Sequence, residues 1–182
     1  MAYYKTKRLS LRTLSVSDFP LLKDYLLRNR TFLTPWEPLR PDSYFEETVI
    51  LARIEDEIKA ASNRSLVSLY ISQIGEDRII GNVTLSNIVR GPFQSCYMGY
   101  KLDETEIHKG YITEAVEKVI EIAFDELALH RIEANIMPRN FRSIRVVEKL
   151  GFVYEGLSKS YLKINGIWED HMHYVLLNKS MS

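Results

Sequence analysis

The sequence predicts one α+β (α/β) domain in which helices flank a central mixed, mostly antiparallel sheet of seven strands. Apolar residues alternate along seven segments and recur at helical spacing along four others, in the order β-α-α-β-β-β-α-β-α-β-β. The length of 182 residues, with 46% hydrophobic and 26% charged residues, is typical of a single folded domain covering positions 1–182.

The first third of the chain is expected to hold one strand and two helices. Apolar and polar residues alternate over 7–14, which predicts a strand, and Ser17-Asp18 offers an N-cap for a helix that ends near position 29. Three prolines then make 34–42 a rigid, non-helical loop. The sequence Ser43-Tyr44-Phe45-Glu46 has the form of a capping box and is expected to open a second helix that extends to about position 61.

The middle of the chain is expected to form three strands and a crossover. The strand-like runs are 66–73, 78–85 and 95–102, and Gly75-Glu76-Asp77 suits a hairpin turn between the first two. A helix from about Gly110 to Leu127 has one apolar face and leads to a strand at 131–137. Because a helical crossover joins parallel strands, the runs 95–102 and 131–137 should be parallel.

The last third is expected to contain a short helix and a hairpin. The helix extends from Asn140 to Leu150, and Gly151 follows it as a C′ residue would. Strands at 152–164 and 167–177 are joined through Asn165-Gly166, a strong hairpin signal.

Composition and charge exclude several classes of protein. Lys plus Arg and Asp plus Glu number 24 each, so there is no overall attraction to nucleic acid or to an anionic membrane. The single cysteine, Cys96, excludes an internal disulfide and a cysteine-rich zinc site and is expected to be a small buried hydrophobe. No signal peptide is recognisable, and no apolar run approaches the roughly 20 residues that span a bilayer, so a cytoplasmic protein is expected. His171 and His173 would share one face of a strand, and two ligands do not make a metal site.

Two segments of the sequence carry residues that suit ligand binding or catalysis. The junction 100–113 between a strand and a helix directs backbone N–H groups and the positive end of the helix dipole at one point, which favours a phosphate. Gly110 permits close backbone approach and Lys109 adds charge, although any helix start offers free N–H groups. In the second segment Asn140 is placed to cap a helix, and Ser143 in its first turn is either a solvated residue or a catalytic hydroxyl.

Together, the segments of the chain resemble the GNAT superfamily of acyl-CoA-dependent N-acyltransferases, and within it the ribosomal-protein-alanine N-acetyltransferase group. The residues that carry the resemblance occur in the family's order along nearly the whole chain: Phe32 to Pro38, Met98 to Leu102, Gly110 to Ala115, His130 to Ala134, Asn140 to Ser143, Leu150 to Phe152 and Tyr161 to His171. The resemblance implies a GNAT-like domain with a V-shaped opening between strands 95–102 and 131–137, where acetyl-CoA enters.

The resemblance also implies roles for individual residues. The backbone of Tyr100 and Leu102 would pair with the pantetheine arm, Asn140 would hydrogen-bond that arm, and Ser143 would lie near the thioester sulfur and donate a proton to it. The pyrophosphate would be cradled by His108, Lys109, Gly110, Tyr111, Ile112 and Thr113. In the family's motif, Gln/Arg-x-x-Gly-x-Gly/Ala, only Gly110 matches in full: the other positions are occupied here by Ile107, by Ile112 and, where many relatives have glycine, by His108.

The sequence leaves the general base open. Glu37, in the loop Trp36-Glu37-Pro38, either binds or deprotonates an α-amino group or is a surface carboxylate beside an aromatic ring. Asp170 and His171 on the last hairpin are the alternatives, and an imidazole titrates near neutrality as a base should. Tyr161 and Trp168 are expected to pack on the sheet rather than to touch substrate.

The function implied by the resemblance is acetyl-CoA-dependent transfer of an acetyl group directly to a primary amine, with the N-terminal α-amino group of a protein or peptide as the first expectation. A small amine such as an amino acid, polyamine or antibiotic is an alternative acceptor. A non-catalytic acyl-CoA-binding sensor is an alternative of a different class. Acetyl-CoA is expected as co-substrate without a metal, with no direct nucleic-acid or membrane partner. The oligomeric state is open, a homodimer included.

Overall fold

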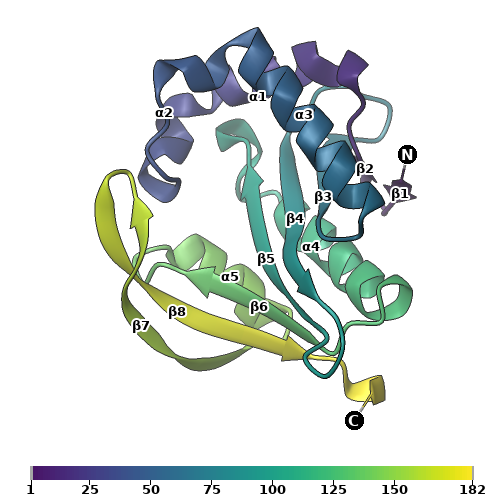
Figure 1. The fold of residues 1–182 in the computed structure, drawn as a ribbon, viewed down its shortest axis with the longest axis vertical. Helices are drawn as coiled ribbons and strands as arrows, with labels where there is room; N and C mark the ends of the chain where they lie inside the picture. Colours follow the sequence, from purple (N-terminus) through teal and green to yellow (C-terminus); the bar gives the residue numbers. More distant parts are fainter. Residues whose placement is uncertain (1, 182) are drawn as a thin grey trace.

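The structure is a computed structural model that describes residues 2–181. One eight-stranded sheet has the strand order β1-β2-β3-β4-β5-β6-β8-β7, and helices cover parts of both faces (Figure 1). Neighbouring strands are antiparallel except β5 and β6, which are parallel as the crossover predicts. The predicted α+β domain with a mixed sheet is confirmed, with eight strands in place of the expected seven.

The additional strand lies at the N-terminal edge of the sheet. Its three residues pair antiparallel with β2, and so short a strand leaves no clear alternation in the sequence. The strands are β1 (Tyr3–Lys5), β2 (Leu9–Arg12), β3 (Val67–Gln73), β4 (Gly81–Val89), β5 (Ser95–Leu102), β6 (Arg131–Ile136), β7 (Val153–Ile164) and β8 (Ile167–Leu177).

Five α-helices lie among the described residues, and one of them starts at a different residue from the one that the sequence predicted. The helices are α1 (Phe19–Arg28), α2 (Arg30–Leu33), α3 (Glu47–Ser62), α4 (Tyr111–Glu121), which continues as a π-helical turn at Ile122–Glu126, and α5 (Phe141–Lys149). The prediction of a capping box at Ser43 is wrong, because Asp42–Phe45 forms a 3-10 turn. The Glu46 N–H closes this turn by donating a hydrogen bond to the Ser43 carbonyl at 3.0 Å. Glu46 is then extended, and α3 starts after it.

The loop 34–42 is only partly as expected. Residues Thr34–Trp36 form a 3-10 turn with Pro35 in its first turn, where a missing N–H costs nothing, and the short helix α2 precedes them.

The strand that was expected at 78–85 also has different bounds, since the strand β4 begins at Gly81.

Two hydrophobic clusters hold the helices to the sheet. On one face α4 and α5 pack over the centre of the sheet, with Ala115, Val116, Val119 and Val147 fully buried. On the other face α1 and α3 pack over β3 through Leu22, Tyr25, Ile50, Ile54 and Tyr70. Because α1–α3 gather over β2–β4, the same face of β6 and β8 stays uncovered (Figure 1).

The two parallel strands diverge, as the V-shaped opening requires. They pair at only three positions, Ser95 with Arg131, Cys96 with Ile132 and Tyr97 with Glu133, although both strands continue beyond these pairs. The backbone edges of β5 and β6 beyond Tyr97 and Glu133 therefore face a gap (Figure 1).

Two turn signals are confirmed in detail. Gly151 has φ +84° and follows α5 in a Schellman arrangement, with its N–H bonded to the Glu148 carbonyl at 3.1 Å and the Phe152 N–H to the Val147 carbonyl at 3.0 Å. At the tip of the last hairpin Asn165 and Gly166 have φ +44° and +82°, the left-handed pair of a type I′ turn.

Candidate active site

A cavity of about 350 Å³ lies between the end of β5, the start of α4 and the start of α5. Eight of the residues predicted to contact the cofactor line it: Tyr100, Leu102, His108, Gly110, Ile112, Thr113, Asn140 and Ser143. Two side chains of the predicted set are directed elsewhere. The Lys109 ammonium binds Glu106 at 2.9 Å, and the Tyr111 hydroxyl donates to Gln73 at 2.9 Å. We call this space the cofactor cavity.

The backbone at the start of α4 is shaped to present donors. His108 and Gly110 both lie in the left-handed region, with φ +65° and +79°, which turns the chain sharply before the helix. The first hydrogen bond of the helix is donated by the Glu114 N–H to the Gly110 carbonyl at 3.2 Å. The N–H groups of residues 111–113 therefore have no acceptor within the helix. A positive φ is uncommon for a residue other than glycine, so His108 holds a backbone conformation that glycine adopts at less cost.

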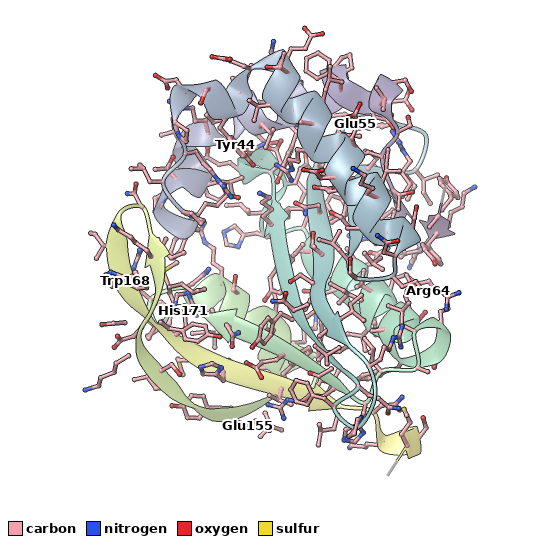
Figure 2. The ribbon with its side chains drawn as sticks, viewed as in Figure 1. Tyr44, Glu55, Arg64, Glu155, Trp168 and His171 are labelled. Atoms are coloured by element: carbon pink, nitrogen blue, oxygen red, sulfur yellow. The ribbon has the colours of Figure 1, made fainter. Side chains whose placement is uncertain are left out.

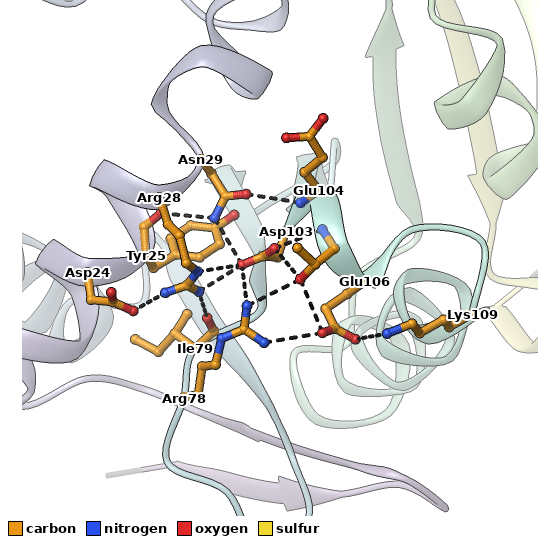
Figure 3. Close-up of polar contacts among 11 residues, drawn as sticks. Asp24, Tyr25, Arg28, Asn29, Arg78, Ile79, Asp103, Glu104, Glu106 and Lys109 are labelled. Carbon is orange, nitrogen blue, oxygen red and sulfur yellow. Dashed lines mark hydrogen bonds and ion pairs between the residues drawn. The ribbon is translucent and has the colours of Figure 1, made fainter.

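A buried carboxylate fixes the chain that leads from β5 into this loop (Figure 3). Asp103 is 1% exposed and accepts hydrogen bonds from Arg28 at 2.7 Å, from the Asn29 amide at 3.1 Å and from the Thr105 N–H at 2.9 Å. Burial alone would raise the pKa of Asp103, but these donors outweigh it and hold that pKa well below its usual value. The carboxylate therefore stays charged and ties α1 to the end of β5.

The same network extends to Lys109 (Figure 3). The Arg78 guanidinium donates to Asp103 and to Glu106, each at 3.2 Å, and Lys109 binds the other oxygen of Glu106. Arg8 donates to the Lys109 carbonyl at 2.9 Å and pairs with Glu114 at 2.7 Å. The Lys109 charge is thus largely compensated within the chain, and this loop offers a ligand mainly its backbone.

The first turn of α5 brings Asn140 and Ser143 into the cofactor cavity. The Asn140 side chain accepts a hydrogen bond from the Ser143 N–H at 3.2 Å, so the predicted helix cap is confirmed. The Tyr100 hydroxyl donates to the Ser143 carbonyl at 2.8 Å and ties this turn to β5. The Ser143 side chain is a further hydrogen-bond partner of Tyr100, so the two hydroxyl groups lie together in the wall of the cavity.

A second cavity of about 520 Å³ lies on the open face of the sheet, between β4, β5, β6 and α3. Its polar lining includes Glu37, Arg53, Glu57, Asn82, Thr84, Asn135 and His171. The two cavities share Leu33, Trp36, Tyr100, Lys101, Asn140 and Ser143. Both spaces therefore meet at these residues, Ser143 among them, and we call the second one the acceptor cavity.

Glu37 lies in the wall of the acceptor cavity but already holds a cation. Its carboxylate pairs with the Lys101 ammonium, and the two side chains are 18% and 19% exposed. Burial lowers the pKa of Lys101, and the Glu37 carboxylate opposes that shift. The Glu37 carbonyl accepts the Asn165 N–H at 2.8 Å, which ties this loop to the tip of the β7–β8 hairpin.

His171 is the candidate base that the structure places in the acceptor cavity without a competing charge partner. It is 3% exposed and lies on β8 at the base of the protruding hairpin (Figure 2). Its Nδ1 donates to the Glu169 carbonyl at 3.0 Å, which leaves Nε2 as the nitrogen with the lone pair. Burial lowers the pKa of His171, so the ring is neutral near pH 7. Asp170 instead accepts the Ser160 N–H at 2.8 Å and lies outside the cavity.

His171 and His173 share one face of β8, as predicted, and the Tyr161 ring packs against both, at 5.6 and 5.0 Å between ring centroids. Tyr161 thus packs on the sheet as expected, whereas Trp168 is 60% exposed on the hairpin, so the expectation that it packs on the sheet is wrong.

Cys96 is 2% exposed, and burial raises the pKa of its thiol to about 12, which confirms it as a small buried hydrophobe.

Several lining residues were not singled out by the sequence patterns. Arg142 and Arg145, three residues apart on α5, line the cofactor cavity, and their spacing on a helix face that starts at the site was an available signal. Asn82 and Thr84 alternate with Val83 and Leu85 on β4, which places two polar side chains on one face of the strand. Asn135 on β6 carried no such signal.

The fold, the diverging strands and the two joined cavities define an N-acetyltransferase of the GNAT family. The acetyltransferase (GNAT) domain profile matches residues 8–153, and the chain belongs to this family. It is 40% identical over 174 residues to the probable N-acetyltransferase YjcK of Bacillus subtilis (strain 168), covering 96% of both chains. It is 38% identical over 167 residues to the ribosomal protein uS5-alanine N-acetyltransferase of Escherichia coli (strain K12), covering 92% of this chain and 86% of that enzyme.

Solved structures agree with these relationships. The ribosomal-protein-S5-alanine acetyltransferase of Vibrio fischeri superposes with a TM-score of 0.94 at 35% identity and full coverage of both chains. RimJ of Mycobacterium smegmatis, solved in complex with CoA-disulfide, superposes with a TM-score of 0.89 at 27% identity and covers 95% of this chain and 83% of that one.

Within residues 2–181 no helix has the length and apolar character to cross a membrane. The described residues also contain no group of three or more His, Cys, Asp or Glu placed to hold a metal.

Proposed function

We propose that this chain transfers the acetyl group of acetyl-CoA to the N-terminal α-amino group of a protein or peptide. The observation that carries the proposal is the meeting of two cavities at Ser143, one beside the donor-rich start of α4 and one on the open face of the sheet. The E. coli relative is named for acting on an alanine of ribosomal protein uS5, and the M. smegmatis neighbour was solved with CoA-disulfide.

The residues of the cofactor cavity fit a long anionic ligand with an apolar arm. Unpaired N–H groups at the start of α4, together with Arg142 and Arg145, suit the phosphates. Leu102, Ile112 and Val146 supply apolar walls for the arm. The backbone edge of β5 beyond Tyr97 has no strand partner on the β6 side and can hydrogen-bond the amides of the arm. Acetyl-CoA bound there supplies an activated acetyl thioester.

The acceptor cavity supplies a proton acceptor, and the shared wall supplies a donor. His171 is neutral and has its Nε2 lone pair available, so it can take the proton that the attacking amine must lose. The Ser143 hydroxyl, which lies beside the Tyr100 hydroxyl, can donate a proton to the departing sulfur. Glu37 serves in this scheme as the counter-ion of Lys101 rather than as the base.

An acceptor panel with acetyl-CoA tests the proposal. The panel contains a peptide with a free N-terminus and an internal lysine, the same peptide with a blocked N-terminus, and a polyamine, with release of free thiol as the readout and mass spectrometry to place the acetyl group. We expect turnover of the free peptide only, acetylated at its α-amino group. Turnover of the polyamine alone would favour the small-amine alternative. Binding of acetyl-CoA without turnover of any amine would favour a sensor.

A further inference from the structure

Two buried amide oxygens in the acceptor cavity have no hydrogen-bond partner. Among residues 2–181, only three buried side-chain polar atoms lack a partner, and two of them are the Oδ1 atoms of Asn82 and Asn135. Asn82 is 5% exposed, and both side chains line this cavity. Buried carbonyl oxygens are normally satisfied, so two exceptions in one cavity point to a ligand that donates to them.

Between these two side chains the floor of the cavity is bare backbone. Gly99 on β5 pairs with Thr84 of β4, two residues along the strand from the pair that Asn82 makes with Lys101. Gly99 and Asn135 each lie two residues beyond the last β5–β6 pair, on the two sides of the gap between the diverging strands. An added Cβ at Gly99 would meet nothing within 4 Å, and its backbone is not left-handed. The neighbouring side chains on this face of β5, Tyr97 and Lys101, are large, so Gly99 opens a passage across the strand.

Among the described residues, the charged groups that line this cavity are paired except Arg40, whose guanidinium packs over the Tyr44 ring. Arg53 binds Glu57 at 3.0 Å and the Tyr70 hydroxyl at 3.0 Å, and Lys101 binds Glu37. The buried side-chain atoms without a partner in this cavity are the two carbonyl oxygens. A carbonyl oxygen only accepts hydrogen bonds, so both suit a ligand that carries N–H groups.

The positions of the oxygens select an extended ligand. Asn82 and Asn135 lie on the strands either side of β5, and because β5 and β6 diverge beyond Tyr97 and Glu133, more than two strand spacings of about 4.8 Å separate the two residues. A single ammonium cannot reach both, whereas an extended chain of three or more residues, at roughly 3.3 Å each, can. The terminal amide torsion of asparagine is soft, so each side chain can turn its oxygen to an incoming donor.

We propose that the acceptor peptide crosses β5 at Gly99 and that the N–H groups of its first residues donate to Asn82 Oδ1 and Asn135 Oδ1. This inference rests on the proposed function and specifies it, because it makes the acceptor an extended peptide rather than a compact amine. Asn82 and Asn135 are then binding residues for the peptide backbone, and they leave the peptide's side chains free to vary.

The variant Gly99→Val tests the passage. A valine there fills open space on a strand, where β-branched residues are favoured, so the melting temperature should not fall. We expect the KM of the peptide to rise at least tenfold while the KM of acetyl-CoA stays unchanged. Ser86→Val is the matched control: it lies on the same face of β4 outside both cavities and should alter neither constant.

The variant Asn135→Leu tests the unpaired oxygen. It keeps the size of the side chain and removes its polar atoms, so the peptide KM should rise several-fold while the melting temperature stays constant or increases. A purely structural role for Asn135 would instead lower the melting temperature. Unchanged peptide kinetics in both variants would overturn this inference alone. Failure of the wild-type protein to acetylate any peptide would overturn the proposed function and this inference together.

Discussion

Replacing Glu37 with glutamine leaves the Lys101 ammonium without its carboxylate in a wall that is mostly shielded from water. Removing one member of a fully buried ion pair costs about 3–5 kcal/mol. The side chains here are 18% and 19% exposed, and the glutamine oxygen can still accept a hydrogen bond, so we expect a loss of about 1–2 kcal/mol. For a chain of this size the melting temperature should fall by roughly 2–8 °C.

The loss should depend on pH. Burial already lowers the pKa of Lys101 below the ordinary value of 10.5, and without Glu37 the pKa falls further. Between the folded pKa and 10.5 the unfolded chain binds more protons than the folded one, so the stability of Glu37→Gln rises with pH across this range. The variant should therefore recover towards wild-type stability as the pH is raised.

Thermal unfolding of four proteins over a pH series measures this effect: wild type, Glu37→Gln, Lys101→Met and the double variant. We expect the double variant to be more stable than Glu37→Gln, because it removes the unpaired charge. The same proteins should show a raised acceptor KM for Glu37→Gln with no change in the KM of acetyl-CoA, since Glu37 lines the acceptor cavity and not the cofactor cavity. If Glu37→Gln is as stable as wild type, or the second substitution does not restore stability, the reasoning about this pair is refuted.

Three further substitutions probe other contacts. Asn140→Ala removes the cap on the Ser143 N–H, so it should cost about 1 kcal/mol in unfolding free energy and also lower kcat/KM; a variant as stable and active as wild type would contradict both roles. The side-chain hydrogen bonds from Arg12 lower the pKa of Asp18 to about 2, so this carboxylate stabilises the fold above about pH 4 and its contribution is lost as the pH falls towards 2. Asp18→Asn should flatten that part of the acid unfolding curve, and an identical curve would show that the pair contributes nothing. His171→Gln should lower kcat by about 10²-fold or more and abolish the acidic limb of the pH–rate profile, whereas an unchanged profile would exclude His171 as the base.

The sequence predicted most accurately the turns and helix ends that depend on a few adjacent residues. The Asn165-Gly166 turn, the C′ role of Gly151 and the N-cap role of Asn140 each depend on a few adjacent residues, and all are confirmed. The parallel pairing of β5 with β6 followed from the helix that joins them. The Ser43 capping box failed because its residues form a 3-10 turn before α3, which short patterns do not distinguish from a helix start.

The partners of the site residues depend on contacts distant in sequence, and no pattern along the chain contains them. Glu37 looked like a lone carboxylate, but Lys101, 64 positions away, neutralises it. Lys109 looked available to a phosphate, but Glu106 holds it inside the network around Asp103. Asn135 became a candidate only when the structure showed its unpaired oxygen in the acceptor cavity.

A crystal structure with a bisubstrate conjugate, in which CoA is joined through an acetyl linker to the N-terminus of a short peptide, tests the central claim most directly. The account predicts the pantetheine arm in the cofactor cavity beside Tyr100, the sulfur near Ser143 and the peptide in the acceptor cavity. The peptide should cross β5 at Gly99. A conjugate whose CoA portion lies away from the start of α4, or whose peptide leaves Ser143 without entering the acceptor cavity, would contradict the account.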